Sequence, residues 1–144
     1  MSGICVFCEI LSGARAAHVV FEDQHSLAFL DQRPLFPGHC LLVPRQHHET
    51  LQELPAELVS PLFLGARLLA RAVEGAMQAE GVFVAMNNRV SQSVPHLHIH
   101  VVPRRQKDGL RGFFWPRGKY ESDEAAVAAR DAIRAAVAEF QRQG

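Results

Sequence analysis

Residues 95–103 read Pro95-His96-Leu97-His98-Ile99-His100-Val101-Val102-Pro103, and this stretch sets the expectations for both fold and site. In a β-strand, successive side chains point to opposite faces of the sheet. The three histidines therefore share one face, while Leu97, Ile99 and Val101 point into a core on the other. Burying an imidazole on such a strand costs free energy unless the ring has a hydrogen-bond or metal partner. Their strict alternation indicates either a three-histidine metal site or a nucleophilic imidazole flanked by supporting histidines.

The rest of the chain supplies a sheet and two long helices. We expect five short apolar strands bounded by turn residues, at His18–Asp23, Ser26–Asp31, His39–Pro44, Val82–Asn88 and His96–Pro103. An apolar stripe at helical spacing predicts a helix from Leu54-Pro55-Ala56-Glu57 to about Glu80, with Gly81 suited to cap its end. Ser122 is expected to cap a second helix with an apolar face. These elements indicate an α+β domain on an antiparallel sheet of five strands.

The composition is that of one globular domain over residues 1–144. Hydrophobic types make up 48% of the chain, and 15 Lys+Arg balance 15 Asp+Glu. A protein with zero net charge has no global field for nucleic-acid polymers or anionic membranes, so any phosphate chemistry comes from a local site. No apolar run is long enough to span a membrane, and the first residues lack the pattern of a signal peptide. We therefore expect a cytoplasmic protein.

The three cysteines, Cys5, Cys8 and Cys40, are an odd number and a poor disulfide framework. Cys5 and Cys8 form a C-x-x-C motif, which in a reducing compartment indicates a redox pair or half of a metal site. The redox motif usually opens a helix after a strand, and no strand can precede residue 5. A metal site is therefore favoured, provided that two further ligands exist. Cys40 lies in an apolar run and is expected to be a small buried residue.

These motifs resemble the histidine triad (HIT) family. Its motif, His-φ-His-φ-His-φ-φ with φ apolar, is matched in full by residues 96–102. The block Pro37-Gly38-His39-Cys40-Leu41-Leu42-Val43-Pro44 resembles the second family motif, and Gln92-Ser93-Val94 and the N-terminal C-x-x-C also fit. The resemblance covers residues 5 to 103 and implies a HIT-like fold, whereas residues 104–144 add little to it.

The resemblance implies nucleotidyl transfer by the middle histidine, His98. Its imidazole would attack the α-phosphorus of a nucleotide and carry the nucleotidyl group until water or another acceptor takes it. A neutral imidazole is nucleophilic near neutral pH when its other ring nitrogen donates to a carbonyl or carboxylate. His100 and His39 would stabilise charge on phosphorus without a catalytic metal, and His96 completes the triad.

Two alternatives remain open beside this hydrolase or transferase. One is a nucleotide-binding or signalling module with negligible turnover, although binding alone does not need His98. The other is a zinc-dependent hydrolase that uses the triad as metal ligands, although no carboxylate base lies near the triad in sequence. The nucleotide conjugate and the acceptor are also left open.

The same resemblance implies the nucleotide contacts. Phe7 and Phe29 are expected to contact the base, and Asp31 is expected to bind the ribose hydroxyls. The residues expected to contact the phosphates or the leaving group are Asn87, Gln92 and Ser93. A carboxylate that accepts from two hydroxyls makes a charge-assisted contact. Phe7 is equally compatible with plain core packing, and Gln92 and Ser93 with a turn. The loop Asn88-Arg89-Val90-Ser91 is about two residues shorter than the common family pattern, and its arginine brings a positive charge.

Relatives with a C-x-x-C combine it with two histidines, and the implied zinc ligands here are Cys5, Cys8, His47 and His96. Four protein ligands leave no open position, so this zinc would be structural. His47 matches the family spacing, and the adjacent His48 is the alternative ligand. The resemblance further implies a homodimer. The aromatic and basic segment Leu110–Arg117 is compatible with a lid, a polyphosphate contact, a dimer interface or a core anchor.

Overall fold

The computed structural model describes residues 3–111 and 117–143. Internal contacts divide the chain into two compact units, Met1–Asp108 and Gly109–Gly144, and each is described by itself. The single domain expected over residues 1–144 stays a prediction. Within the described ranges, none of the helices combines the length with the apolar character that a membrane crossing requires.

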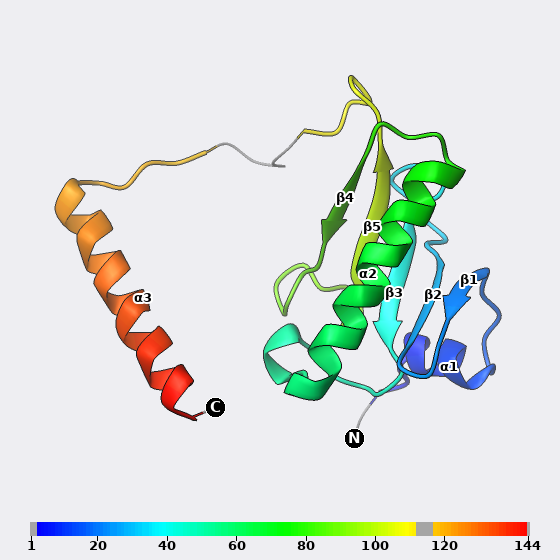
Figure 1. Cartoon of the computed structure of the whole chain (residues 1–144), viewed down its shortest axis with the longest axis horizontal. Coiled ribbons are helices and arrows are strands. Elements are labelled where there is room, and N and C mark those ends of the chain that lie inside the picture. The colour runs from blue at the N-terminus through cyan, green and yellow to red at the C-terminus, as the bar shows by residue number, and fades with distance from the viewer. Residues whose placement is uncertain (1–2, 112–116, 144) are drawn as a thin grey trace. The chain divides into compact units, whose positions relative to one another are not determined.

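The first unit is built on a five-stranded sheet in which every neighbouring pair of strands is antiparallel. Its strands are β1 (Val19–Glu22), β2 (Ser26–Leu30), β3 (Cys40–Pro44), β4 (Gly81–Ala85) and β5 (Ile99–Arg104). Their order across the sheet is β1-β2-β3-β5-β4, which puts β3 and β5, the strand that carries His100, side by side in the interior (Figure 1). This arrangement confirms the predicted α+β fold on a five-stranded antiparallel sheet.

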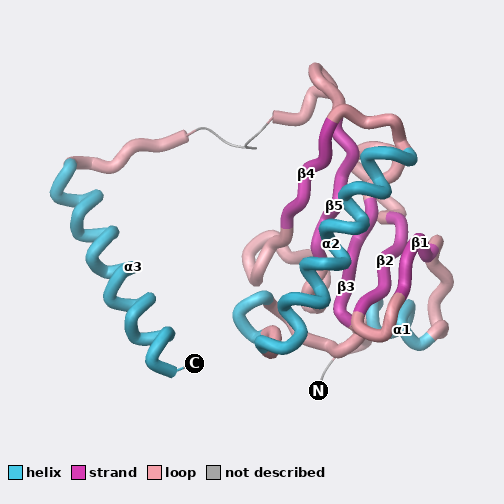
Figure 2. Tube along the Cα trace, viewed as in Figure 1, coloured by secondary structure: helices cyan, strands magenta, loops and turns pink. Residues whose placement is uncertain are grey.

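Two helices cover opposite faces of this sheet. The long helix α2 (Ala56–Ala76) lies along one face, and α1 (Val6–Ser12) lies against the other (Figure 2). A short 3-10 helix, η1 (Leu51–Glu53), precedes α2. The sequence predicted α2 but not α1, because seven residues are too few to show a helical period.

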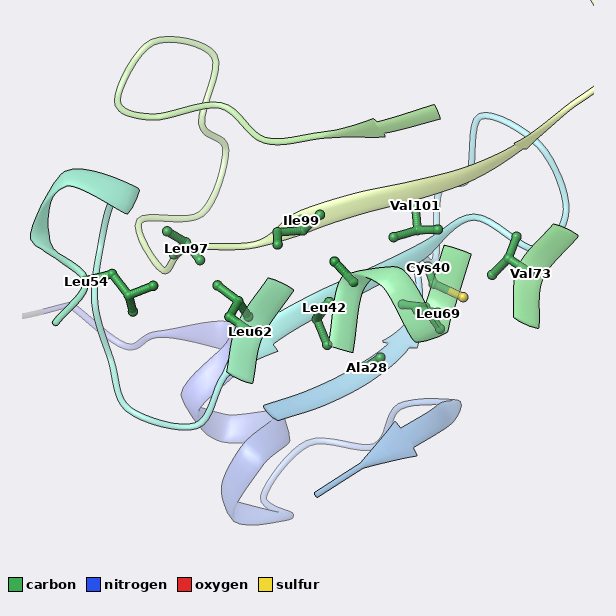
Figure 3. Packing of buried hydrophobic residues seen from close by; sticks show 11 residues of the cluster. Ala28, Cys40, Leu42, Leu54, Leu62, Leu69, Val73, Leu97, Ile99 and Val101 are labelled. Carbon is green, nitrogen blue, oxygen red and sulfur yellow. The ribbon is translucent and has the colours of Figure 1, made fainter. Parts of the chain in front are cut away.

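The alternation along β3 explains why the sheet has a core on both faces. Leu42 is fully buried and packs with Leu62 and Leu69 under α2 (Figure 3). Leu41 and Val43 point the other way and pack with the apolar residues of α1. Burial of a leucine or valine side chain contributes about 1.5–3 kcal/mol relative to exposure. The strands that carry the site are therefore held from both sides.

The end of α2 differs from the prediction. The helix ends at Ala76, and Gly81, which was expected to cap it, is instead the first residue of β4. The chain turns at Gln78, whose positive φ of 52° is followed by a hydrogen bond from the N–H of Ala79 to the Glu74 carbonyl. The helix therefore terminates without glycine, and the prediction for Gly81 was wrong.

The strand β5 is shorter than expected, since it begins at Ile99 rather than at His96. Before Ile99 the backbone bonds to a loop: the N–H of Leu97 donates to the His48 carbonyl. The alternation of side chains persists through this irregular start, with Leu97 and Ile99 buried under α2. The loop that contains His48 therefore accepts the hydrogen bond that a neighbouring strand would otherwise accept. The histidines stay on the face of the sheet that the sequence predicted.

The second unit contains α3 (Asp123–Gln143), none of whose residues is buried. The predicted cap is confirmed, because Ser122 Oγ accepts a hydrogen bond from the N–H of Ala125 at 3.0 Å. Such a contact satisfies one of the free N–H groups at a helix start. Residues 112–116, the aromatic part of Leu110–Arg117, lie outside the described residues, so the roles expected for that segment stay predictions.

Candidate active site

A cavity of about 210 Å³ opens between α1, the ends of β2 and β3, and the triad. Its lining includes Val6, Phe7, Ile10, Phe29, Asp31, Arg33, Leu41, Ser93, His98 and His100. The apolar part of the lining comes from the helix and the strands, and the polar part includes Asp31, two arginines and the two histidines. An apolar wall beside a polar end suits a ligand that joins a flat ring to a polar group.

Six of the eight residues predicted to bind the nucleotide line this cavity, and Asn87 and Gln92 do not. Asn87 Nδ2 donates to the Ser91 carbonyl at 3.2 Å. Gln92 donates to the Glu49 carbonyl at 2.6 Å and accepts from the N–H of Arg89 at 2.8 Å. Both amides therefore hold the loop before the triad, and their contacts with phosphate stay predictions.

A backbone carbonyl sets the tautomer of His98. The Nδ1 atom lies 2.8 Å from the His96 carbonyl oxygen, which can only accept, so Nδ1 carries the proton. The lone pair is then on Nε2. Burial lowers the pKa of His98 below its usual value, although the hydrogen bond to His96 and the charge of Asp31 oppose this. The ring is therefore neutral and nucleophilic near neutral pH.

A second chain of hydrogen bonds orders His39 and His100. The N–H of Leu35 donates to His39 Nδ1 at 3.0 Å, so the proton of a neutral His39 is on Nε2. That Nε2 lies 2.9 Å from His100 Nδ1 and donates to it, which leaves the His100 proton on Nε2. Burial, followed by the neighbouring rings of His98 and His39, lowers the pKa of His100 to about 4. His100 is therefore a neutral N–H donor beside His98.

Asp31 lies at the edge of this chain. Its Oδ1 accepts from the N–H of Arg33 at 2.9 Å, and its Oδ2 is 3.6 Å from His39 Nε2. Asp31, His39 and His100 are close enough to suggest a metal site. However, His39 Nε2 carries a proton, because the other ring nitrogen accepts from Leu35. A protonated nitrogen offers no lone pair, so these three residues do not fit a metal ion.

Four other side chains do fit a metal ion: Cys5, Cys8, His47 and His96, whose ligand atoms all lie within 4.8 Å of one another. His96 Nδ1 is 3.4 Å from Cys5 Sγ and 3.6 Å from Cys8 Sγ, and His47 Nδ1 is 3.3 Å from Cys8 Sγ. Tetrahedral zinc bonds of ordinary length would hold sulfur and nitrogen about 3.6 Å apart. The spacing of this candidate metal centre therefore suits zinc.

The orientation of His96 also suits a ligand. Its Nε2 lies 3.0 Å from the Pro44 carbonyl and donates to it, so the lone pair on Nδ1 faces the sulfurs. His47, not His48, belongs to the centre, since His48 Nε2 lies near Gln46 instead, at 3.3 Å. The triad is thus divided: His96 turns to the cysteines, while His98 and His100 turn to the cavity. This division does not support a metal site made of all three triad histidines.

The sequence analysis did not identify two arginines that line the cavity, nor the backbone groups that orient the histidine rings. Arg33 and Arg15 line the cavity, and Arg15 pairs with Glu9 at 3.0 Å. Arg33 follows Asp31 by two residues, which was a usable signal. No sequence signal points to the Leu35 N–H or the Pro44 carbonyl, because nearly every residue offers the same backbone groups.

The comparison with protein families identifies one matching model, the HIT domain, over residues 12–107. Adenosine 5′-monophosphoramidase of Saccharomyces cerevisiae is 32% identical over 127 residues, which cover 86% of this chain and 77% of that protein. Adenylylsulfatase of Arabidopsis thaliana is 34% identical over 108 residues, 74% of this chain and 55% of that protein.

Solved structures agree with this. A HIT family member from Bacillus subtilis has a TM-score of 0.81 and 32% identity, with 90% of this chain and 94% of that one covered. A zinc-bound histidine triad family protein from Mycobacterium smegmatis has a TM-score of 0.70 and 34% identity, with 97% of each chain covered. The fold of this chain thus recurs in these proteins.

The hydrogen bonds predict the tautomers of three rings. In long-range ¹H–¹⁵N spectra at neutral pH, we expect His98 to carry its proton on Nδ1, and His39 and His100 on Nε2. Because its pKa is lowered to about 4, His100 should also stay neutral at about pH 6, where an ordinary histidine is mostly protonated. A His98 ring protonated on Nε2, or a His100 ring that titrates near 6.5, would contradict this arrangement.

Proposed function

This chain belongs to the HIT domain family, and on that premise we propose that it hydrolyses conjugates of adenosine 5′-monophosphate at the α-phosphorus. The observation that carries the proposal is the 2.8 Å hydrogen bond from His98 Nδ1 to the His96 carbonyl. It leaves a neutral ring with its lone pair on Nε2 in a cavity that also offers an apolar wall. A module that only binds nucleotides has no need of an oriented nucleophile.

In the proposed reaction, His98 Nε2 attacks the α-phosphorus and forms a P–N bond. The bond from phosphorus to the leaving group breaks, and its electron pair goes to the leaving group, which takes a proton from solvent. A water molecule then attacks phosphorus, the P–N electron pair returns to Nε2, and the water proton is released. The products are the nucleoside monophosphate and the protonated leaving group, with His98 neutral again.

His100 and His39 would act on the charge that develops at phosphorus. The His100 Nε2–H is the free donor at the end of the hydrogen bonds that begin at Leu35, and it would donate to a phosphoryl oxygen. Because these donors are already oriented, they need not reorganise during the reaction. No metal ion takes part in this mechanism, and the lowered pKa values of His39 and His100 keep both rings neutral.

The nucleoside would occupy the apolar end of the cavity. The rings of Phe7 and Phe29 meet edge to face, with centroids 5.4 Å apart, and both line the cavity. They would contact the base, while Asp31 would accept from the ribose hydroxyls. Phe7 is 5% exposed, so it is also part of the core, and the two roles expected for it are compatible.

We also propose that Cys5, Cys8, His47 and His96 hold one structural Zn²⁺ ion. The ligand spacing and the zinc-bound relative from Mycobacterium smegmatis support this. Bound zinc would supply a fixed junction between the N-terminal segment and the sheet, not a reactive position, because all four ligands come from the protein. The homodimer and the cytoplasmic location remain proposals that rest on the family and the composition.

The nucleophile is tested by His98→Ala. We expect kcat with adenosine 5′-phosphoramidate to fall by about three orders of magnitude or more, because the covalent path is lost. Binding of AMP should survive, since base and ribose contacts come from other segments. The matched control is His18→Ala, an exposed histidine outside the cavity, which should keep wild-type turnover. Full activity of folded His98→Ala would refute the assignment.

The ribose contact is tested by Asp31→Ala and Asp31→Asn. Loss of a carboxylate acceptor should cost about 1.5–3 kcal/mol, so KM should rise about tenfold or more with kcat little changed. Asparagine keeps an oxygen for the N–H of Arg33 and separates that turn from the ribose contact. A 2′,3′-dideoxy nucleotide should bind the wild type less well and lose this disadvantage in the variants. A collapse of kcat instead would assign Asp31 to the positioning of His39.

The metal centre is tested by elemental analysis of protein purified without an affinity tag. We expect one zinc per chain, and we expect the Cys5→Ser, Cys8→Ser double variant to contain none. The control is Cys40→Ala, which removes a buried thiol outside the centre and should keep the zinc. Zinc that persisted in the double variant would show that these cysteines do not bind it.

A further inference from the structure

The metal centre and the nucleotide cavity share the short helix α1. Cys5 caps its start and Cys8 lies in its first turn, where the Cys8 N–H donates to Cys5 Sγ at 3.4 Å. The same turn carries Val6 and Phe7, and the next carries Ile10, all of which line the cavity. One face of this helix therefore builds a wall of the cavity, and its N-terminal end provides half of the metal ligands.

Little within α1 itself holds it in place. A helix of seven residues is far below the length of about 12–15 at which isolated helices become marginally stable in water. Its position depends on the burial of Phe7 against the sheet and on the contacts of the two cysteine sulfurs with His47 and His96. The sulfurs therefore contribute to the position of the wall that α1 gives to the cavity.

His96 provides a second connection. Its ring nitrogen Nδ1 faces the sulfurs, while its backbone carbonyl accepts from His98 Nδ1 at 2.8 Å. The Phe7 ring contacts both histidine rings, with centroids 5.9 Å from His96 and 5.1 Å from His98. One residue thus belongs to the metal centre through its side chain and to the nucleophile through its backbone.

We propose that zinc loading of this centre and nucleotide binding in the cavity are thermodynamically coupled through α1 and His96. With all four ligands engaged, α1 closes the base side of the cavity and His96 keeps its carbonyl on His98. With the ligands released, the wall loosens while the α2 side of the sheet keeps its own core. The inference rests on the proposed function only in that it requires AMP to bind this cavity.

Coupling of this kind is reciprocal. If zinc raises the affinity for AMP by some factor, AMP must raise the affinity for zinc by the same factor. We expect a factor of about ten or more, within the range usual for linked sites. Neither measurement involves turnover, so the test is independent of the activity of the loaded protein.

The experiment compares His47→Ala with His48→Ala by calorimetric titration with AMP. His47 is a ligand of the centre but does not line the cavity, and its neighbour His48 does neither. We expect AMP affinity to fall about tenfold or more in His47→Ala and in zinc-free wild type, and to be unchanged in His48→Ala. Competition with a chromophoric chelator, with and without saturating AMP, should show zinc affinity rising by the same factor.

Two further readouts locate the effect. In zinc-free protein, amide hydrogen exchange should accelerate in α1 but not in β3 or α2, and the ¹⁵N shifts of His98 should lose their single-tautomer pattern. Loss of protection throughout the sheet would overturn the inference, because the coupling would then be through global unfolding. Equal AMP affinity with and without zinc would overturn it and leave the proposed function standing. Failure of the zinc-loaded protein to bind AMP would overturn both.

Discussion

The hydrogen bond from His98 Nδ1 to the His96 carbonyl is the contact on which the site depends. An imidazole has two nitrogens of similar basicity, and without a fixed partner it exchanges between tautomers. A carbonyl oxygen can only accept, so a donor–acceptor distance of 2.8 Å decides which nitrogen keeps the proton. The same logic orders His39 and His100 through the Leu35 N–H, and it orders His96 through the Pro44 carbonyl. Backbone groups therefore fix the tautomers of His39, His96 and His98, and the ring of His39 passes this order on to His100.

The sheet makes this arrangement of histidines possible because one of its faces is covered by a core and the other borders the cavity. Beneath α2, residues such as Leu42 and Ile99 are fully buried and form a core on the face opposite the cavity. On the other face, α1 packs against Leu41 and Val43 and leaves a cavity open beside the triad. The two faces are thus packed by separate clusters of side chains. The proposed coupling of zinc and nucleotide binding requires this separation, because α1 could then shift while the core under α2 stays packed.

Local sequence patterns predicted the structure correctly where a residue type has one dominant structural role. The alternation at residues 96–101 predicted which side chains share a face, and Ser122 predicted the start of α3. Pattern failed at boundaries that depend on distant partners. β5 begins at Ile99 because a loop takes the Leu97 N–H, and Gly81 enters β4 because the strand pairs it with Arg104. A short helix such as α1 escaped prediction for the same reason, since tertiary contacts hold it.

By itself, the sequence determined the fold class, the family resemblance, and the residue types available for nucleophilic and metal chemistry. It did so because alternation, turn residues and ligand spacing are local properties of the chain. The tertiary structure alone decided how these groups divide: His96 faces the cysteines, His98 and His100 face the cavity, and His47 rather than His48 lies beside the cysteines. These choices depend on which backbone group or side chain comes within hydrogen-bond distance of each ring, and only the packed chain brings those groups together.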